Sequence, residues 1–103
     1  MDNEKLYQAK AEVLRALGHP TRLFIAEKLR SGEKCVCEIA KGIDADLSTV
    51  SKHLSVLKYA GIIEDRREGK SIYYRLKVPC VLEFTDCVES VLRSKAKACA
   101  VSI

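Results

Sequence analysis

Cysteine is the residue of this 103-residue sequence best suited to chemistry, and two of its five cysteines are separated by a single residue. That pair lies in the segment Lys34-Cys35-Val36-Cys37-Glu38, and the other three lie in the last quarter of the chain: Cys80, Cys87 and Cys99. Thiolates bind soft metal and metalloid ions in preference to magnesium or calcium. The pair is therefore a candidate ligand site for a soft ion.

The compartment decides whether these thiols stay reduced. Residues 1–10 are polar and contain no apolar signal-peptide core, and no apolar run is long enough to cross a bilayer. We therefore expect a cytoplasmic protein, in which cysteines serve as ligands, redox groups or small core residues rather than as a disulfide framework.

The spacing of Cys35 and Cys37 restricts where both thiols can bind one ion. Residues i and i+2 point to different faces of a regular helix, so their sulfurs converge only where a helix begins and the backbone is irregular. A helix start also offers free N–H groups and the positive end of the dipole, which favour thiolates, and Lys34 adds a cation. The sequence therefore predicts a helix that starts directly after Cys35.

A third sulfur is needed for arsenite, which forms three bonds, whereas cadmium, lead or zinc would usually take a fourth ligand. Cys80 and Cys87 are seven residues apart, about 10.5 Å along a helix. Two sulfurs on one ion lie only about 4 Å apart, so one chain cannot supply both of these cysteines to one site. Cys87 lies among apolar residues and is expected in the core. Cys99 is our predicted third ligand, and Cys80 is the alternative.

Apolar periodicity predicts a single domain, mainly α-helical, with one β-hairpin. The first helix covers residues 4–17 and ends at Gly18-His19-Pro20. The second is capped by the Thr21 hydroxyl, directs Leu23, Phe24 and Leu29 inward and ends at Ser31-Gly32. Further helices follow Cys35, run from Ser48 to Tyr59, and follow Pro79, the last with an apolar stripe that needs a partner.

Residues 34–59 have the pattern of a helix-turn-helix, two helices joined by the short turn at residues 42–46. The second helix of such a motif lies in the major groove of DNA, and its N-terminal residues meet the base edges. Hydroxyls and lysine bind bases or phosphates there. The predicted DNA-reading residues are Ser48, Thr49, Ser51, Lys52 and His53, the last of which we expect to face DNA or solvent rather than a metal.

A hairpin at residues 62–76 follows directly, and we expect its turn at residues 67–70. Its cations Arg66, Arg67 and Lys70 are placed where a wing would lie along the phosphate backbone. Between residues 48 and 75 there are six cations and three anions, so this window supplies most of the formal net charge of +4. A basic stripe of this kind favours a polyanion partner.

Together these motifs resemble the ArsR–SmtB repressors over residues 11–77. The resemblance is carried by residues 16–23 (ALGHPTRL), 47–54 (LSTVSKHL), 60–63 (AGII), 67–70 (REGK) and 73–76 (YYRL). It implies a winged helix-turn-helix homodimer, joined through helices at residues 4–17 and 80–97, that binds a palindromic operator. It also implies a repressor whose metal-bound form leaves DNA.

The segment Cys35-Val36-Cys37-Glu38-Ile39 resembles the cysteine pair of the members that respond to arsenic and to cadmium or lead. Ala40 stands where the commonest arsenic version has its third cysteine, and the N-terminus lacks the cysteines of the cadmium/lead version. The last helix lacks the histidines of the zinc and nickel sensors. The implied inducer is As(III) or Sb(III), or else Cd(II) or Pb(II), bound by Cys35 and Cys37, and Cys99 is the third ligand that we predict.

Two other classes of function compete with this interpretation. A winged-helix repressor that senses redox state or sulfide through its cysteines fits the same thiols. A thiol enzyme would need a Cys-x-x-Cys at a helix start or a nucleophilic cysteine in a phosphate-binding loop. The sequence has neither pattern, so we expect no catalytic activity.

Overall fold

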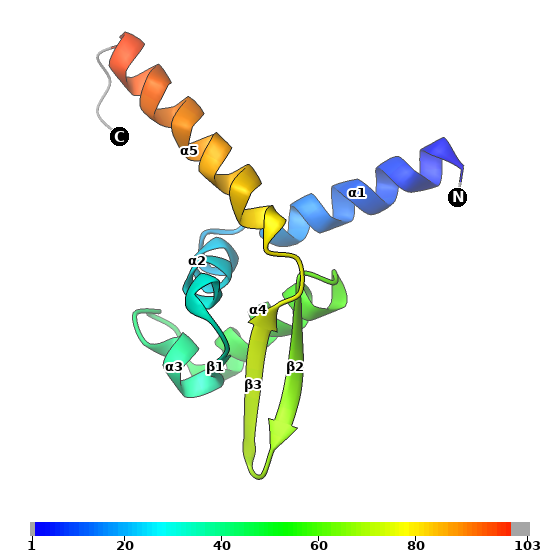
Figure 1. Cartoon of the computed structure of the whole chain (residues 1–103), viewed down its shortest axis with the longest axis vertical. Helices are drawn as coiled ribbons and strands as arrows, with labels where there is room; N and C mark the ends of the chain where they lie inside the picture. Colours follow the sequence, from blue (N-terminus) through cyan, green and yellow to red (C-terminus); the bar gives the residue numbers. More distant parts are fainter. Residues whose placement is uncertain (1, 100–103) are drawn as a thin grey trace.

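The computed structural model describes residues 2–99, with side chains described for residues 2–96. Figure 1 shows a helical body from which a two-stranded wing and two long helices project. The elements are α1 (Asn3–Leu17), α2 (Pro20–Lys28), the 3-10 helix η1 (Leu29–Ser31), β1 (Lys34–Cys35), α3 (Val36–Ala40), α4 (Leu47–Tyr59), β2 (Ile63–Glu68), β3 (Ser71–Leu76) and α5 (Cys80–Cys99). The predicted winged helix-turn-helix is confirmed.

The core lies between the end of α1, α2, α4 and the base of the wing. In α4 the residues at spacing i, i+4 and i+7, Val50, Leu54 and Leu57, are all buried, as the sequence predicts. They pack with Ile39 of α3 and with Ile62 and Ile63, which lead into β2. This shared core fixes the helix-turn-helix and the wing relative to each other.

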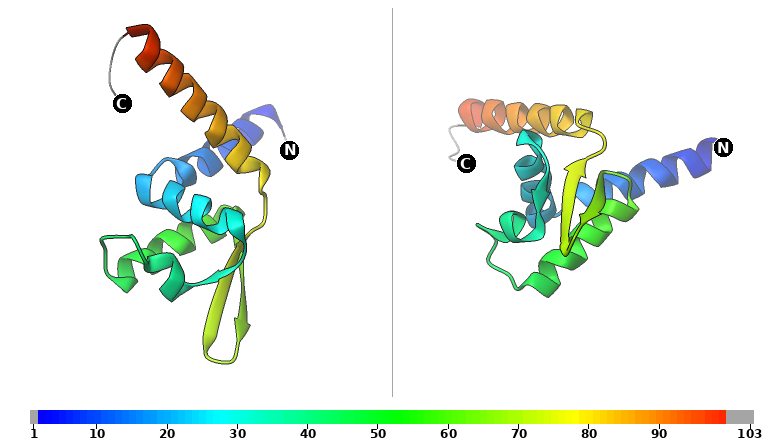
Figure 2. Two further views of the ribbon diagram at one scale, coloured as in Figure 1. Left: turned by 60° about the vertical axis from the view of Figure 1, so that its left-hand side comes forward. Right: turned by 60° about the horizontal axis from the view of Figure 1, so that its bottom comes forward.

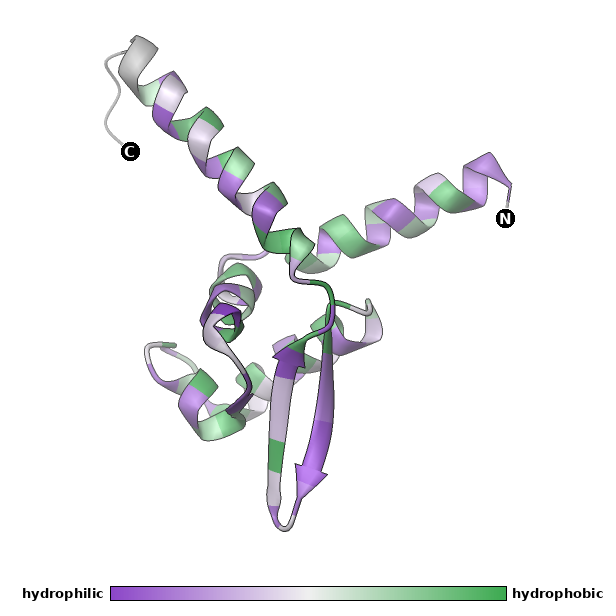
Figure 3. Ribbon diagram, in the orientation of Figure 1, coloured by the Kyte–Doolittle hydropathy of each residue, from purple (hydrophilic) through white to green (hydrophobic). Residues whose placement is uncertain are grey.

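Helices α1 and α5 project from the body and leave much apolar surface uncovered. Figures 1 and 2 show both helices as arms that diverge from the core, and Figure 3 shows apolar and polar residues alternating along each. Among the α5 residues whose side chains are described, only Leu82 is buried. Large apolar side chains are exposed on both arms: Leu6, Tyr7, Leu14, Phe84, Val88, Val91 and Leu92. The prediction that the apolar stripe of the last helix needs a partner agrees with this exposure.

The start of α2 differs from the prediction. Its cap is His19, whose Nδ1 accepts a hydrogen bond from the Thr21 N–H at 3.1 Å, and Pro20 follows as the first helical residue. The prediction that the Thr21 hydroxyl caps this helix is therefore wrong: the cap lies two residues earlier, because proline is favoured as the first helical residue. Phe24 is also not inward: its side chain is 41% exposed.

Strand β2 runs further towards the turn than predicted, and the sheet gains a third strand. Strand β2 continues through Arg67 to Glu68, so the turn contains only Gly69 and Lys70, not residues 67–70. Gly69 has φ 61°, which glycine adopts without strain and which suits a two-residue hairpin turn. Strand β1 pairs antiparallel with β3, so that the sheet order is β1-β3-β2. Two residues are too short for a periodic signal, and β1 was missed.

None of the described helices meets the length and hydropathy needed to cross a membrane.

Candidate nucleic-acid interface and thiol site

The recognition helix α4 is positioned by its cap and its buried stripe. The Asp46 carboxylate accepts a hydrogen bond from the Thr49 N–H at 2.7 Å, and this contact holds the pKa of Asp46 below its usual value. Burial of the stripe turns the opposite face to solvent. Four of the predicted DNA-reading residues are exposed on it: Ser48, Thr49, Ser51 and Lys52.

His53 lies elsewhere on α4. Its side chain is half-buried, its ring centroid is 4.5 Å from that of His19, and its Nδ1 is 3.3 Å from the Arg22 guanidinium. Arginine only donates, so Nδ1 accepts and His53 is neutral with its proton on Nε2. Burial lowers the pKa of His53, with smaller effects from His19 and Arg22. The expectation of a His53 side chain open to solvent is wrong, and its contact with DNA stays a prediction.

Arg22 joins α1 to this helix. It donates hydrogen bonds to the carbonyl oxygens of Ala16 and Arg15 at the end of α1, as well as to His53. A cation at a helix C-terminus satisfies carbonyls that have no partner within the helix. Arg22 and His53 therefore set the orientation of the recognition helix against the first arm.

Ion pairs divide the six cations of the basic window into two groups. Lys58 pairs with Asp65 at 3.1 Å, Arg75 pairs with Glu64, and Arg66 pairs with two carboxylates. Within the described residues, no ion pair involves the other three, which are Lys52, Arg67 and Lys70. These three carry charge that remains available to a phosphate.

The thiol pair lies where the sequence places it, at the start of α3. Cys35 is the N-cap residue and half-buried, and Cys37, two residues on, is exposed. The Cys35 N–H donates to the Glu38 carboxylate at 3.1 Å. The pKa of Glu38 is lowered first by this backbone contact and then by the Cys35 thiol. Two soft donors at one helix start, one of them exposed, suit a soft ion.

The other end of α3 is held by a side chain from α2. Lys28 Nζ donates to the carbonyl oxygen of Glu38 at 2.7 Å and to that of Lys41, and lies 3.4 Å from that of Ile39. A lysine at the C-terminus of a helix complements the dipole. Glu38 at one end and Lys28 at the other stabilise a helix of five residues that would be too short to form alone.

The remaining cysteines are dispersed. Cys80 and Cys87 are both exposed on α5, so the prediction that Cys87 packs in the core of this chain is wrong. The apolar residues around it line the uncovered face of the arm instead. Cys99, the predicted third ligand, lies outside the residues whose side chains are described. Among described side chains, no group of three or more possible metal ligands occurs.

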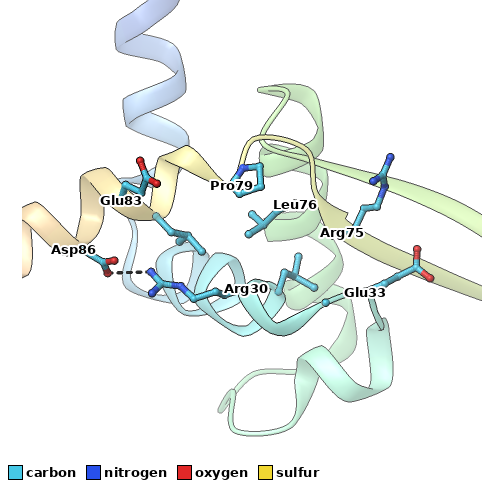
Figure 4. A pocket seen from close by; sticks show the side chains of 10 residues that line it. Arg30, Glu33, Arg75, Leu76, Pro79, Glu83 and Asp86 are labelled. Carbon is cyan, nitrogen blue, oxygen red and sulfur yellow. Dashed lines mark hydrogen bonds and ion pairs between the residues drawn. The ribbon is translucent and has the colours of Figure 1, made fainter.

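Helix α5 is tied to the body beside the thiol segment. Arg30 of η1 pairs with Asp86 of α5 at 2.9 Å, as Figure 4 shows, and with Glu27 at 3.2 Å. The pocket of about 470 Å³ in Figure 4 is lined on its other side by Glu33, which precedes β1, and by Arg75 of the wing. Helix α5, the residue that precedes β1 and the wing therefore all line this pocket.

Several residues that build the site were missed in the sequence. Glu38 stands three residues after Cys35, the spacing of a capping box, and that signal was present. Lys28, Glu33 and Arg22 act on partners 6 to 33 residues away along the chain. No local pattern predicts such contacts.

Comparison with known proteins agrees with this geometry. Residues 19–65 match the model of "Bacterial regulatory protein, arsR family". An uncharacterized HTH-type transcriptional regulator of Methanocaldococcus jannaschii is 37% identical over 82% of this chain and 97% of its own length. The chain belongs to the ArsR family. It is thus a DNA-binding transcriptional regulator and not an enzyme.

Two relatives of this family have names that mention repression or a metal. The transcriptional repressor SmtB of Mycobacterium tuberculosis is 38% identical over 70% of this chain and 53% of its own length. A cadmium resistance regulatory protein, the CadC homolog of Staphylococcus aureus, is 46% identical over 64% and 55% respectively. The chain thus spans only about half of these two relatives.

Solved structures share the fold over most of the chain. A homodimeric winged helix-turn-helix DNA-binding domain from Mycobacterium bovis superimposes with a TM-score of 0.79 at 33% identity, covering 95% of this chain and 93% of its own. A possible transcriptional regulator for arsenical resistance gives 0.66 at 32% identity, covering 78% and 83%. Both support the assignment of wing and recognition helix.

Proposed function

We propose that the protein is a cytoplasmic homodimeric repressor that is released from its operator when Cys35 and Cys37 bind As(III) or Sb(III), or a soft ion such as Cd(II) or Pb(II). The observation that carries this proposal is the thiol pair at the start of α3. It lies in the helix-turn-helix itself and is joined to the wing by the pairing of β1 with β3.

DNA binding is assigned to the exposed side of α4 and to the unpaired cations of the wing. Ser48, Thr49, Ser51 and Lys52 would meet base edges and phosphates in the major groove. Arg67 and Lys70 would lie along the neighbouring phosphates, supplying affinity without sequence choice. Two copies joined through α1 and α5 would read two half-sites about one helical turn apart.

The bound ion would be a soft electrophile that accepts electron pairs from thiolate ligands. Cys35 and Cys37 would provide two sulfurs, and the third would come from Cys99, with Cys80 as the alternative, from either subunit. Binding would join α3 to the last helix and change the spacing of the two reading heads. A ligand shifts an equilibrium between two states only if it binds one of them more tightly than the other. Release therefore requires that the ligated protein bind the operator more weakly than the free protein.

The relatives support a metal inducer, since one is a cadmium resistance regulator and one structural neighbour is a possible regulator for arsenical resistance. The experiment is an operator-release titration with arsenite on wild type and on Cys35→Ser, Cys37→Ser, Cys80→Ser, Cys87→Ser and Cys99→Ser. Loss of release in the first two and in Cys99→Ser is expected, and normal release in Cys87→Ser is the control. A normal response of Cys35→Ser and Cys37→Ser contradicts the assignment.

Redox or sulfide sensing is the second candidate, because Cys37, Cys80 and Cys87 are exposed and open to oxidants. Intact mass spectrometry separates the two. Treatment with arsenite gives one metalloid adduct with the loss of three thiol protons, whereas treatment with peroxide or persulfide gives a disulfide or sulfur adduct. The inducer is the treatment whose product also leaves the operator.

A further inference from the structure

The Arg66 guanidinium of the wing is held within the protein by two carboxylates and an aromatic ring. Glu33 accepts hydrogen bonds from Arg66 Nε at 2.9 and 3.0 Å and from Nη2 at 2.6 Å, and Glu68 accepts from Nη1 at 2.8 Å. The guanidinium also lies 4.8 Å from the centre of the Tyr73 ring. This two-point pairing is the geometry in which arginine binds a carboxylate most strongly. The same donors would be needed to bind a phosphate.

The Arg66–Glu33 ion pair joins the wing to the segment that leads into Cys35. Glu33 directly precedes β1, and in the sheet Cys35 is opposite Tyr73, the residue over which Arg66 lies. Arg66 is itself opposite Tyr73 from the other side, on β2. The ion pair and the strand pairing thus fasten one short segment, residues 33–35, to the wing. A shift of Cys35 would carry the wing with it.

The Arg66–Glu33 ion pair contributes little to the stability of the fold. The side chains of Arg66 and Glu33 are 50% and 28% exposed, and exposed pairs add little to stability because water and salt screen them. Its larger effect is electrostatic, since it neutralises one cation of the wing while leaving its neighbour Arg67, which points to the opposite face of β2, without an ion pair among the described residues.

We propose that Glu33 is a positioning residue that keeps Arg66 from the operator phosphates and fastens the wing to the segment carrying Cys35, so that ligand binding at the thiols moves the wing. The second half of this proposal rests on the proposed function. The first half does not.

The first test needs no inducer and uses the salt dependence of operator affinity. The variant Glu33→Gln/Arg66→Gln removes both charges together, and Arg67→Gln removes one cation that has no ion pair within residues 2–96. We expect the double variant to keep the wild-type slope of log K against log salt, and Arg67→Gln to reduce the slope by about 1 for each subunit. A double variant that loses as much slope as Arg67→Gln places Arg66 on a phosphate and overturns the proposal.

The second test measures coupling as the ratio of operator affinities without and with arsenite. The double variant Glu33→Gln/Arg66→Gln should lower this ratio by about 2- to 30-fold. The control is Glu68→Gln, which removes the other carboxylate on Arg66. It should leave the ratio unchanged, because Glu68 does not contact the segment that leads into β1. Mass spectrometry of the arsenite adduct checks that each variant still binds the ligand, and circular dichroism checks that it is folded. An unchanged ratio in the double variant overturns the coupling role. A wild type that arsenite does not release contradicts the proposed function, and the salt test still decides the role of Glu33.

Discussion

At the residue scale, the ion pairs separate cations that the sequence treats alike. The basic window correctly indicated a polyanion partner, yet Lys58, Arg66 and Arg75 are matched by Asp65, Glu33 with Glu68, and Glu64. Charge pairing depends on which strands lie side by side, and that register is not visible in composition. What a phosphate meets is therefore a smaller set of cations than the sequence suggests.

Lys52→Ala and Arg67→Ala should each weaken operator binding and reduce its salt slope by about 1 per subunit, because each removes a cation without an ion pair among the described residues. Fluorescence anisotropy at several salt concentrations measures both effects. Lys58→Ala is the matched control, since its charge is already balanced by Asp65. Equal slopes for all four proteins would contradict the proposed docking.

His53 predicts a dependence of stability on pH. Its pKa in the fold lies below the ordinary histidine value of 6.5, chiefly through burial, so the unfolded chain takes up a proton first as pH falls. The stability that neutral His53 contributes is complete above 6.5 and declines as pH drops below that value towards the folded pKa.

Urea unfolding of wild type and His53→Asn at pH 7.5 and 5.5 tests this. The asparagine oxygen still accepts from Arg22 but does not titrate. The wild-type midpoint should fall more between the two pH values than that of the variant. Identical falls would contradict a pKa of His53 that burial holds below its ordinary value in the fold.

At the element scale, helices with a local sequence signal were predicted well, including the short α3, whereas strand β1, which depends on a distant partner, was not. The stripe Val50, Leu54 and Leu57 located α4 to within one residue because burial imposes the 3.6-residue period. Strand β1 exists only because β3 provides a partner, and α3 is held by Glu38 and Lys28. The thiol pair was located correctly since a two-residue spacing requires a helix start.

The cap of the recognition helix gives a prediction at this scale. Asp46→Ala should lower the Tm by several degrees and weaken operator binding, because the Thr49 N–H loses its acceptor at the end that meets DNA. Asp46→Asn keeps an acceptor without the charge, so its Tm and operator affinity should lie between those of wild type and Asp46→Ala. The hydrogen bond from the Thr49 N–H lowers the pKa of Asp46, so its contribution to stability is present above the ordinary aspartate value of 3.8 and is lost as pH falls through the folded value.

Differential scanning calorimetry at pH 7 and pH 3 measures this contribution. The difference in Tm between wild type and Asp46→Asn should shrink at the lower pH. A difference that does not change with pH would indicate that the charge of Asp46 is not what stabilises α4.

At the scale of the whole molecule, the two arms determine whether the reading heads can act together. The exposed apolar residues of α1 and α5 are more than a single chain covers, and the homodimeric neighbour shares 93% of its length with this fold. Spacing between two heads is a property of the dimer, so any ligand that alters the arms alters operator binding. Sequence patterns revealed the apolar stripe but not its geometry.

Val91→Glu tests the proposed dimer, because Val91 is 65% exposed on α5 and a charge there opposes burial against a second copy. We expect a monomer by sedimentation and a loss of operator affinity of more than about tenfold, since one half-site is then bound alone. Glu89→Gln, on the same helix, is the control. A Val91→Glu protein that remains dimeric would place the interface elsewhere.

The central claim is that a soft ion on the Cys35 and Cys37 thiols and a fully engaged operator exclude each other. The most direct measurement is the operator Kd of the free protein and of the same protein saturated with arsenite, at one salt concentration, with the Cys35→Ser/Cys37→Ser variant as the blank. We predict that arsenite raises the wild-type Kd by about 5- to 150-fold and leaves the variant unchanged. An operator complex that stays intact in saturating arsenite, antimonite, cadmium and lead would contradict the account.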